Sequence, residues 1–166
     1  MAGAAHQTAI FAAGCFWGVQ YYFDQVPGVI KTAAGYTGGH TNHPTYEQVS
    51  HHITGHAEAV KITYDPEIIG FEALLKQFFR MHDPTQLNRQ GPDIGDQYRS
   101  AIFYRDSFQK AAAQRQINTI NATNKYNRPL ATRLEPAGRF WPAEDYHQKF
   151  TERTDRGMCH VPYAAV

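Results

Sequence analysis

Cys15 and Cys159 are the two residues of this chain best suited to covalent chemistry. Cys15 follows an apolar run that ends at Gly14, and it stands where a helical pattern begins. Unpaired backbone N–H groups and the helix dipole at such a position favour a thiolate. Cys15 can therefore act as a nucleophile, although a buried structural cysteine is an equally simple explanation.

Two aromatic residues follow this cysteine directly. Phe16 shares helical spacing with Val19 and Phe23, so a place in the core explains it when it is taken alone. Trp17 has mostly polar helical neighbours and is expected off that apolar stripe, beside the thiol. It can form one wall of a small apolar pocket, or it can cover a loop at the surface.

A carboxyl group opens the alternating segment 58–64. Glu58 shares a face with Val60 and Ile62, the face that we expect to be buried. Burial among apolar side chains disfavours a charged carboxylate and preserves an acid near neutral pH. Because Glu58 comes first in the segment, it can also point into solvent, and the sequence leaves both interpretations open.

Polar segments that contain glycine or proline hold three more candidates, Tyr46, Asp93 and Tyr98, since such segments position side chains for ligands more often than for packing. One polar stretch also holds five histidines: His40, His43, His51, His52 and His56. Imidazole binds zinc, copper and nickel, but these spacings match no common zinc pattern and both cysteines lie far away in sequence. We therefore do not expect a metal site.

Strands and helices alternate along the chain. Period-2 and period-3.6 patterns predict strands at residues 8–13, 29–36, 58–64, 98–104 and 130–134, and helices at 16–26, from 71 to the Asp83-Pro84 stop, at 106–122 and around 144–150. Residues 39–55 and 88–97 are predicted to be a long loop and a turn-rich segment. The expected fold class is an α/β (α+β) two-layer sandwich with a central mixed sheet, flanking helices and an irregular C-terminal tail.

Length and composition fit one domain. With 166 residues, 42% of them hydrophobic and 19% charged, we expect a single domain over residues 1–166, with 151–166 as a mobile tail that carries Cys159. A net charge of +1, with both signs interspersed, gives no argument for nucleic acid or an anionic membrane. No signal-peptide pattern or bilayer-length apolar run is present, so we expect a cytoplasmic protein and a monomer.

The string Gly14-Cys15-Phe16-Trp17-Gly18 resembles the nucleophile motif of the A-class peptide methionine sulfoxide reductases. Six further blocks resemble that family in the order in which the family has them: residues 35–40, 44–47, 55–58, 82–86, 90–95 and 142–147. Together the blocks cover nearly the whole chain up to the tail. Such a series is not expected by chance.

The resemblance implies a role for each matching residue. Cys15 would be the nucleophile, Glu58 the proton donor, Tyr46 and Tyr98 the hydrogen-bonding partners of the sulfoxide oxygen, Phe16 and Trp17 the pocket for the substrate methyl group, and Asp93 an orienting group for the substrate backbone. Several family members carry two cysteines near a glycine-rich end, whereas this chain has only Cys159 there. The histidine pair His51-His52 has no role in the family pattern.

The implied activity is thiol-dependent reduction of the S epimer of free or protein-bound methionine sulfoxide, which repairs oxidised proteins. Cys15 would become a sulfenic acid and then a disulfide with Cys159, recycled by thioredoxin, or by dithiothreitol in vitro, with no metal or bound organic cofactor. Two other classes stay open. A cysteine peroxidase also forms a sulfenic acid, but it would need a threonine or arginine near the thiol, and a metal-binding module would use the histidine stretch.

Overall fold

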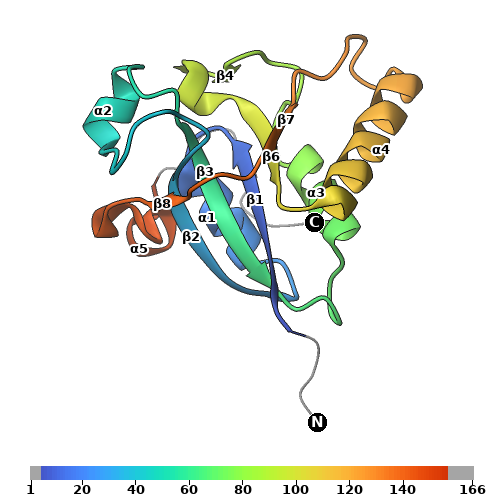
Figure 1. Cartoon of the computed structure of the whole chain (residues 1–166), viewed down its shortest axis with the longest axis horizontal. Coiled ribbons are helices and arrows are strands. Elements are labelled where there is room, and N and C mark those ends of the chain that lie inside the picture. The colour runs from blue at the N-terminus through green and yellow to red at the C-terminus, as the bar shows by residue number, and fades with distance from the viewer. Residues whose placement is uncertain (1–4, 157–166) are drawn as a thin grey trace.

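A six-stranded sheet organises this computed structural model, which describes residues 5–156 (Figure 1). Its strands are β1 (Gln7–Ala13), β2 (Val29–Thr37), β3 (Ala57–Tyr64), β6 (Ser100–Tyr104), β7 (Arg133–Pro136) and β8 (Trp141–Pro142). They lie in the order β7-β6-β1-β3-β2-β8, and neighbours are antiparallel except for the parallel pair β6 and β7. The predicted mixed sheet is confirmed.

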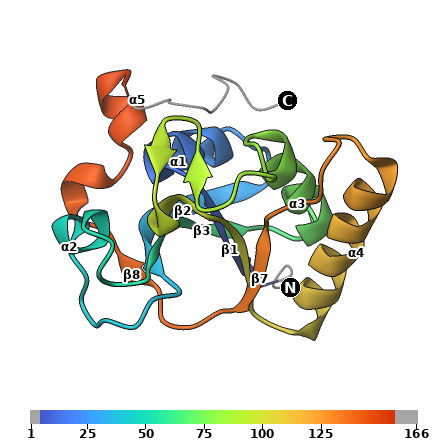
Figure 2. The ribbon, with the colours of Figure 1, turned by 90° about the horizontal axis from the view of Figure 1, so that it is seen from above.

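The helices pack mainly on one face of this sheet. They are α1 (Phe16–Asp24), α2 (Tyr46–Ser50), α3 (Phe71–Arg80), α4 (Ser107–Thr123) and α5 (Phe150–Thr154), with 3₁₀ turns η1 (Asp96–Tyr98) and η2 (Asp145–His147). Figure 2 shows α1 and α3 on one side of the sheet and the segment between β7 and β8 crossing the other side. This second side has a smaller core, in which Phe103 packs with alanines of β1, β3 and β6. None of the helices within residues 5–156 is long and apolar enough to cross a membrane.

The main core joins β1 and β3 to the helices. Phe11 of β1 lies with its ring centroid 5.7 Å from that of Phe23 in α1 and 5.0 Å from that of Phe78 in α3. On β3 the alternating residues Val60 and Ile62 are fully buried against the same helices. The alternation seen in the sequence thus places the β3 face that begins at Glu58 toward α1.

Helix α4 begins as the sequence predicts, at Asp106, whose carboxylate accepts a hydrogen bond from the backbone N–H of Gln109 at 2.9 Å. The Gln109 side chain bonds to other parts of the chain. Its carbonyl oxygen accepts from Arg105 N–H, and its amide donates to the carbonyl of Thr8 in β1. The residue therefore ties α4 to the sheet.

Four segments differ from the predictions. The predicted loop 39–55 contains helix α2, and α5 includes residues 151–154, which the sequence analysis places in an irregular tail. The last predicted strand, 130–134, forms at Arg133–Pro136, because its pairing is set by parallel contact with β6 and not by its own alternation. Within the turn-rich segment, β4 (Arg89–Gln90) and β5 (Asp93–Ile94) form a hairpin.

Candidate active site

Cys15 occupies the junction between β1 and α1. The chain turns there through Gly14, whose φ of +95° suits glycine and strains other residues. Cys15 is the N-cap residue of α1 and is 9% exposed. Its place at the helix start agrees with the prediction, and the helix dipole favours negative charge there.

Glu58 lies against the same helix end. It is 2% exposed, and its Oε1 atom accepts a hydrogen bond from the Phe16 backbone N–H at 3.2 Å. The interpretation that Glu58 points into solvent is therefore wrong. Burial disfavours the charged form of the carboxyl group, whereas the hydrogen bond from the Phe16 N–H favours it. The two effects therefore oppose each other at Glu58.

Two tyrosine hydroxyls complete the polar side of the site. Burial raises the pKa of Tyr98 far above its ordinary value, and the charge of Glu58 acts in the same direction. Burial also raises the pKa of Tyr46, assisted by the charges of Glu58 and Cys15 and partly opposed by hydrogen bonds with Ser50 and Tyr98. Both hydroxyls thus keep their protons at neutral pH and can donate to an oxygen atom.

Tyr46 is held in place by a carboxylate that the sequence analysis did not single out. Glu144 accepts a hydrogen bond from the Tyr46 backbone N–H at 2.9 Å and another from the Tyr36 hydroxyl at 2.8 Å. Burial would raise the pKa of Glu144, but these hydrogen bonds outweigh it and lower the pKa. Tyr36 stands opposite Glu58 in the β2–β3 pairing, so it lies beside the candidate acid.

The aromatic side of the site is built around His147. Its ring centroid lies 5.2 Å from that of Phe16, 5.6 Å from that of Trp17 and 4.6 Å from that of Tyr46. Trp17 is half-buried, stacks on Phe150 at 3.9 Å and donates its indole N–H to Nδ1 of His147 at 2.8 Å. Trp17 is thus fixed against His147 and Phe150, off the apolar stripe of α1, and does not merely cover a loop.

Asp93 and Cys159 remain to be placed. Asp93 is half-buried in β5, and its charge contributes to the raised pKa of Tyr98, which puts it at the edge of the same group. Cys159 lies outside the described residues. Glu58 thus contacts the start of α1, the charges of Glu58 and Cys15 both act on Tyr46 and Tyr98, and the charge of Asp93 acts on Tyr98.

The histidine stretch does not form a metal centre in the described part of the chain. His56 is buried, with Nδ1 accepting from Gly39 N–H and Nε2 bonded to the Thr41 carbonyl. Nowhere in residues 5–156 do three or more histidine, cysteine or acidic side chains gather so that they could hold a metal ion. His56 instead joins two parts of the loop through its ring.

Tyr36, Glu144 and His147 are the site residues that residue-by-residue reasoning missed. Each lies far in sequence from its partner: 108 positions separate Tyr36 from Glu144, and 130 separate Trp17 from His147. Local periodicity does not report such contacts. The signal that could have found them is their place in the family-like blocks 35–40 and 142–147.

Comparison with known proteins agrees with this geometry. The family model described as peptide methionine sulfoxide reductase matches residues 7–166. The chain belongs to this family. As a peptide methionine sulfoxide reductase, it is an oxidoreductase, and its mixed sheet with flanking helices is the fold that its relatives share.

Individual relatives match over most of their length. The peptide methionine sulfoxide reductase MsrA of Acidobacterium capsulatum is 51% identical over 92% of this chain and 98% of its own. The crystal structure of reduced Mxr1 from Saccharomyces cerevisiae has a TM-score of 0.82 at 32% identity and covers 92% of this chain and 87% of that chain. A structure of Mxr1 in complex with Trx2 shares the fold, with a TM-score of 0.60 at 23% identity over 90% and 89% of the two chains.

Proposed function

We propose that this reductase uses Cys15 to return the S epimer of methionine sulfoxide to methionine. The observation that carries the proposal is the meeting of a nucleophile and an acid at one helix end. Cys15 caps α1, and Glu58 is hydrogen-bonded to the next residue, Phe16, at 3.2 Å. Geometry of this kind supports attack by sulfur and proton delivery from the same side.

The proposed chemical step transfers one oxygen atom. The Cys15 thiolate attacks the sulfoxide sulfur while Glu58 gives its proton to the sulfoxide oxygen, which forms an adduct with a bond between the two sulfur atoms. The hydroxyl group then passes to the Cys15 sulfur: a Cys15 S–O bond forms while the substrate S–O bond and the S–S bond break. Methionine leaves, and Cys15 remains as a sulfenic acid. The hydroxyls of Tyr46 and Tyr98 stabilise the charge that develops on the oxygen, which their raised pKa values allow because both stay protonated.

Substrate position follows from the aromatic side of the site. Phe16 and Trp17 provide the apolar wall for the methyl group, and Asp93 orients the backbone of the substrate. With the oxygen directed at Glu58, the methyl group fits on one side only, so one epimer reacts. We propose that both free and protein-bound methionine sulfoxide are accepted and that repair of oxidised proteins is the outcome.

Recycling requires a second thiol and a reductant. In our proposal the Cys159 thiol displaces water from the Cys15 sulfenic acid and forms a disulfide. A thioredoxin dithiol then reduces that disulfide by thiol exchange and is itself oxidised. The complex of Mxr1 with Trx2 supports a thioredoxin as the partner, and no metal or bound organic cofactor is required. We further propose that the protein acts as a cytoplasmic monomer.

The test is incubation of the reduced protein with racemic N-blocked methionine sulfoxide and dithiothreitol, followed by chiral separation of the remaining substrate. Loss of the S epimer alone supports the proposal. Loss of both epimers at equal rates contradicts the one-sided pocket, and persistence of both contradicts the assigned chemistry. A Cys15→Ser sample is the matched control for reduction by dithiothreitol itself.

A further inference from the structure

His147 occupies the centre of the aromatic side of the site and has no place in the mechanism above. It is 1% exposed and contacts Phe16, Trp17 and Tyr46, which belong to two different helices. Phe16 and Trp17 are the proposed wall for the methyl group, and Tyr46 is a proposed donor to the oxygen. One imidazole therefore contacts both sides of the substrate position.

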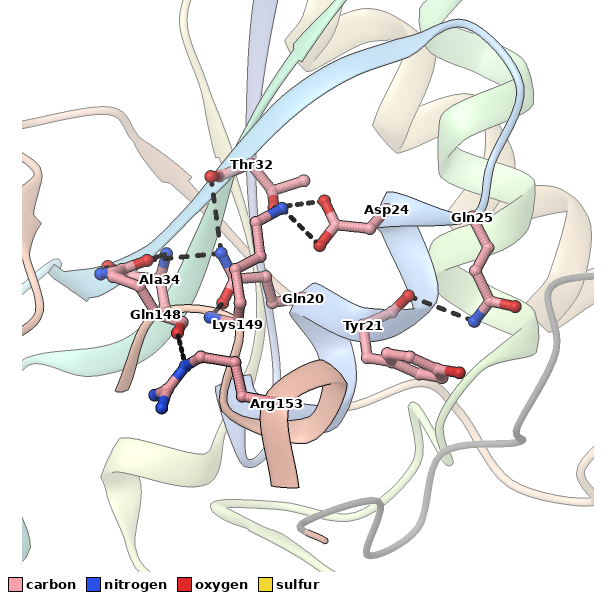
Figure 3. Close-up of polar contacts among 9 residues, drawn as sticks. All are labelled: Gln20, Tyr21, Asp24, Gln25, Thr32, Ala34, Gln148, Lys149 and Arg153. Carbon is pink, nitrogen blue, oxygen red and sulfur yellow. Dashed lines mark hydrogen bonds and ion pairs between the residues drawn. The ribbon is translucent and has the colours of Figure 1, made fainter. Parts of the chain in front are cut away.

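The chain that carries His147 is fixed to the fold by its next two residues (Figure 3). Gln148 exchanges hydrogen bonds with the backbone of Ala34 in β2, at 2.9 Å in both directions. Lys149 donates its backbone N–H to the Gln20 side chain in α1 at 2.9 Å, and its Nζ lies 2.6 Å from Oδ2 of Asp24. These bonds hold the imidazole against α1 without using the ring itself.

The bond to Trp17 identifies the tautomer of His147. An indole N–H can only donate, so Nδ1 of His147 must carry a lone pair, and in the neutral ring the hydrogen is then on Nε2. Within residues 5–156, Nε2 has no hydrogen-bond partner, although it is buried. The bond from Trp17 is therefore the one that determines the orientation of the ring in this part of the chain.

The surroundings of His147 favour the neutral ring. Burial lowers the pKa of His147, and the nearby charge of Glu144 partly opposes that shift. The titratable groups that face the ring are Tyr46 from α2 and Glu144 and Tyr146 from its own segment, whereas α1 faces it with Phe16 and Trp17. Tyr46 and Tyr146 carry no charge at neutral pH because the ordinary tyrosine pKa of about 10 lies well above it and the pKa of each is raised further here.

We propose that His147 is a positioning residue that holds Trp17 in place as the wall of the methyl pocket, and that protonation of its Nδ1 atom releases this wall. A protonated imidazole donates from both nitrogens and cannot accept the indole N–H. Since burial lowers the pKa of His147, release occurs as the pH falls below the ordinary histidine range. The proposal rests on the proposed function for its meaning, but not for its structural test.

The structural test follows the indole N–H signals of the protein by ¹⁵N NMR between about pH 8 and about pH 5. The chain has two tryptophans, and a Trp141→Phe sample assigns the signal of Trp17. We expect the Trp17 signal to shift upfield at the acidic end, with a midpoint below that of an ordinary histidine, as the hydrogen bond is lost. The same signal in His147→Asn, whose side-chain oxygen accepts but does not titrate, should stay constant.

The other tryptophan offers a matched control. The His43 ring lies 4.5 Å from the Trp141 ring, so His43→Gln should change the Trp141 signal and leave the titration of Trp17 intact. A Trp17 signal that does not titrate in the wild type, or that titrates equally in His147→Asn, would overturn the proposal. These spectra need no substrate, so they remain decisive even if the wild type reduces neither epimer.

The kinetic test separates positioning from a general loss of structure. His147→Leu removes the acceptor, and we expect kcat/KM for the S epimer to fall about tenfold, mainly through KM, because the wall contacts bound substrate. His147→Asn should recover part of that loss and should lack the acidic change in KM of the wild type. Equal kinetics in the Leu and Asn variants, with both still folded by circular dichroism, would contradict the role of the acceptor.

Discussion

Cys15 and Glu58 both lie at the start of α1, and the proposed reaction needs them in opposite protonation states. The thiol must lose its proton to attack, while the carboxyl must hold a proton to release the oxygen. The helix dipole favours a negative charge at Cys15, and the Phe16 N–H favours the charged form of Glu58, whereas the burial of Glu58 disfavours it. The proposed mechanism therefore requires the state that combines a Cys15 thiolate with a neutral Glu58.

Removal of the nucleophile should stop the reaction. For Cys15→Ser we expect the rate of sulfoxide reduction to fall by more than about 10³-fold, because the hydroxyl is far less nucleophilic at neutral pH. Single-turnover formation of methionine, measured by chromatography, checks this. Appreciable turnover by the variant would exclude Cys15 as the attacking group.

Removal of the acid should change both the rate and its pH dependence. In Glu58→Gln the amide still accepts the Phe16 N–H but delivers no proton, so the reductive step should slow by about 10²- to 10⁴-fold. The wild-type rate should decline toward high pH as the acid loses its proton, and this decline should be missing in the variant. Stopped-flow measurement of the reductive step gives both quantities, and an unchanged profile would argue against the acid role.

Short elements at the edge of the sheet position the groups that surround the sulfur. Helix α2 supplies Tyr46, and the turn η2 supplies His147, with Glu144 linking the two segments. Neither element has enough residues for a helical period to be visible, so apolar spacing could not predict them. Thr45 and Gln48 do form a reciprocal capping box, and this sequence signal could have revealed α2.

Loss of the hydrogen bonds that Glu144 accepts from Tyr46 and Tyr36 should destabilise both the site and the fold. Because the pKa of Glu144 is lowered in the folded protein, its charged form stabilises the fold at neutral pH, and that contribution is lost as the pH falls through the folded value, below 4.5. In Glu144→Gln we expect the free energy of unfolding to fall by at most about 1 kcal/mol at neutral pH, because solvent partly screens this half-buried group. Urea unfolding at neutral and acidic pH measures the difference, which should shrink on acidification.

Asp145→Asn makes the same change of charge one residue away on an exposed side chain and serves as the control. It should leave the unfolding free energy within about 0.5 kcal/mol of the wild type. If the two variants have the same free energy of unfolding at both pH values, the hydrogen bonds of Glu144 do not stabilise the fold.

Most of the fold was predictable at the scale of elements because its strong patterns are local. The apolar spacing from Phe71 predicts α3, and the alternation after Glu58 predicts β3. The position of β7 was not predictable, since parallel pairing with β6 fixes its register. Contacts within the site followed the same rule: Cys15 and Trp17 were visible from their neighbours, whereas the link from Trp17 to His147 spans 130 positions.

At the scale of the whole molecule, the site exists only when distant parts of the chain meet. The Phe16–Glu58 bond spans 42 positions and the Tyr46–Glu144 bond spans 98. No single hairpin or helix pair holds both the nucleophile and its partners. Activity should therefore report the global fold, and it should disappear together with the core in unfolding experiments.

The proposed cycle also joins Cys15, near the start of the chain, to Cys159, near its end. For Cys159→Ser we expect one methionine per protein in a single turnover but no sustained turnover with thioredoxin, because the sulfenic acid of Cys15 then lacks the proposed thiol partner. Methionine yield with and without thioredoxin, its reductase and NADPH measures this. Full cycling by the variant would remove Cys159 from the mechanism, and loss of the first turnover would show damage beyond the second thiol.

The start of α1 has one further consequence. Its N-cap position is held by a cysteine whose side chain makes no capping hydrogen bond, in a backbone conformation of φ −53° and ψ 121°. Serine is among the best N-cap residues and contributes about 1 kcal/mol in that role. Cys15→Ser should thus melt at a higher temperature than the wild type while reducing no sulfoxide. The thiol that the proposed reaction requires would thus leave the protein less stable than its own inactive variant.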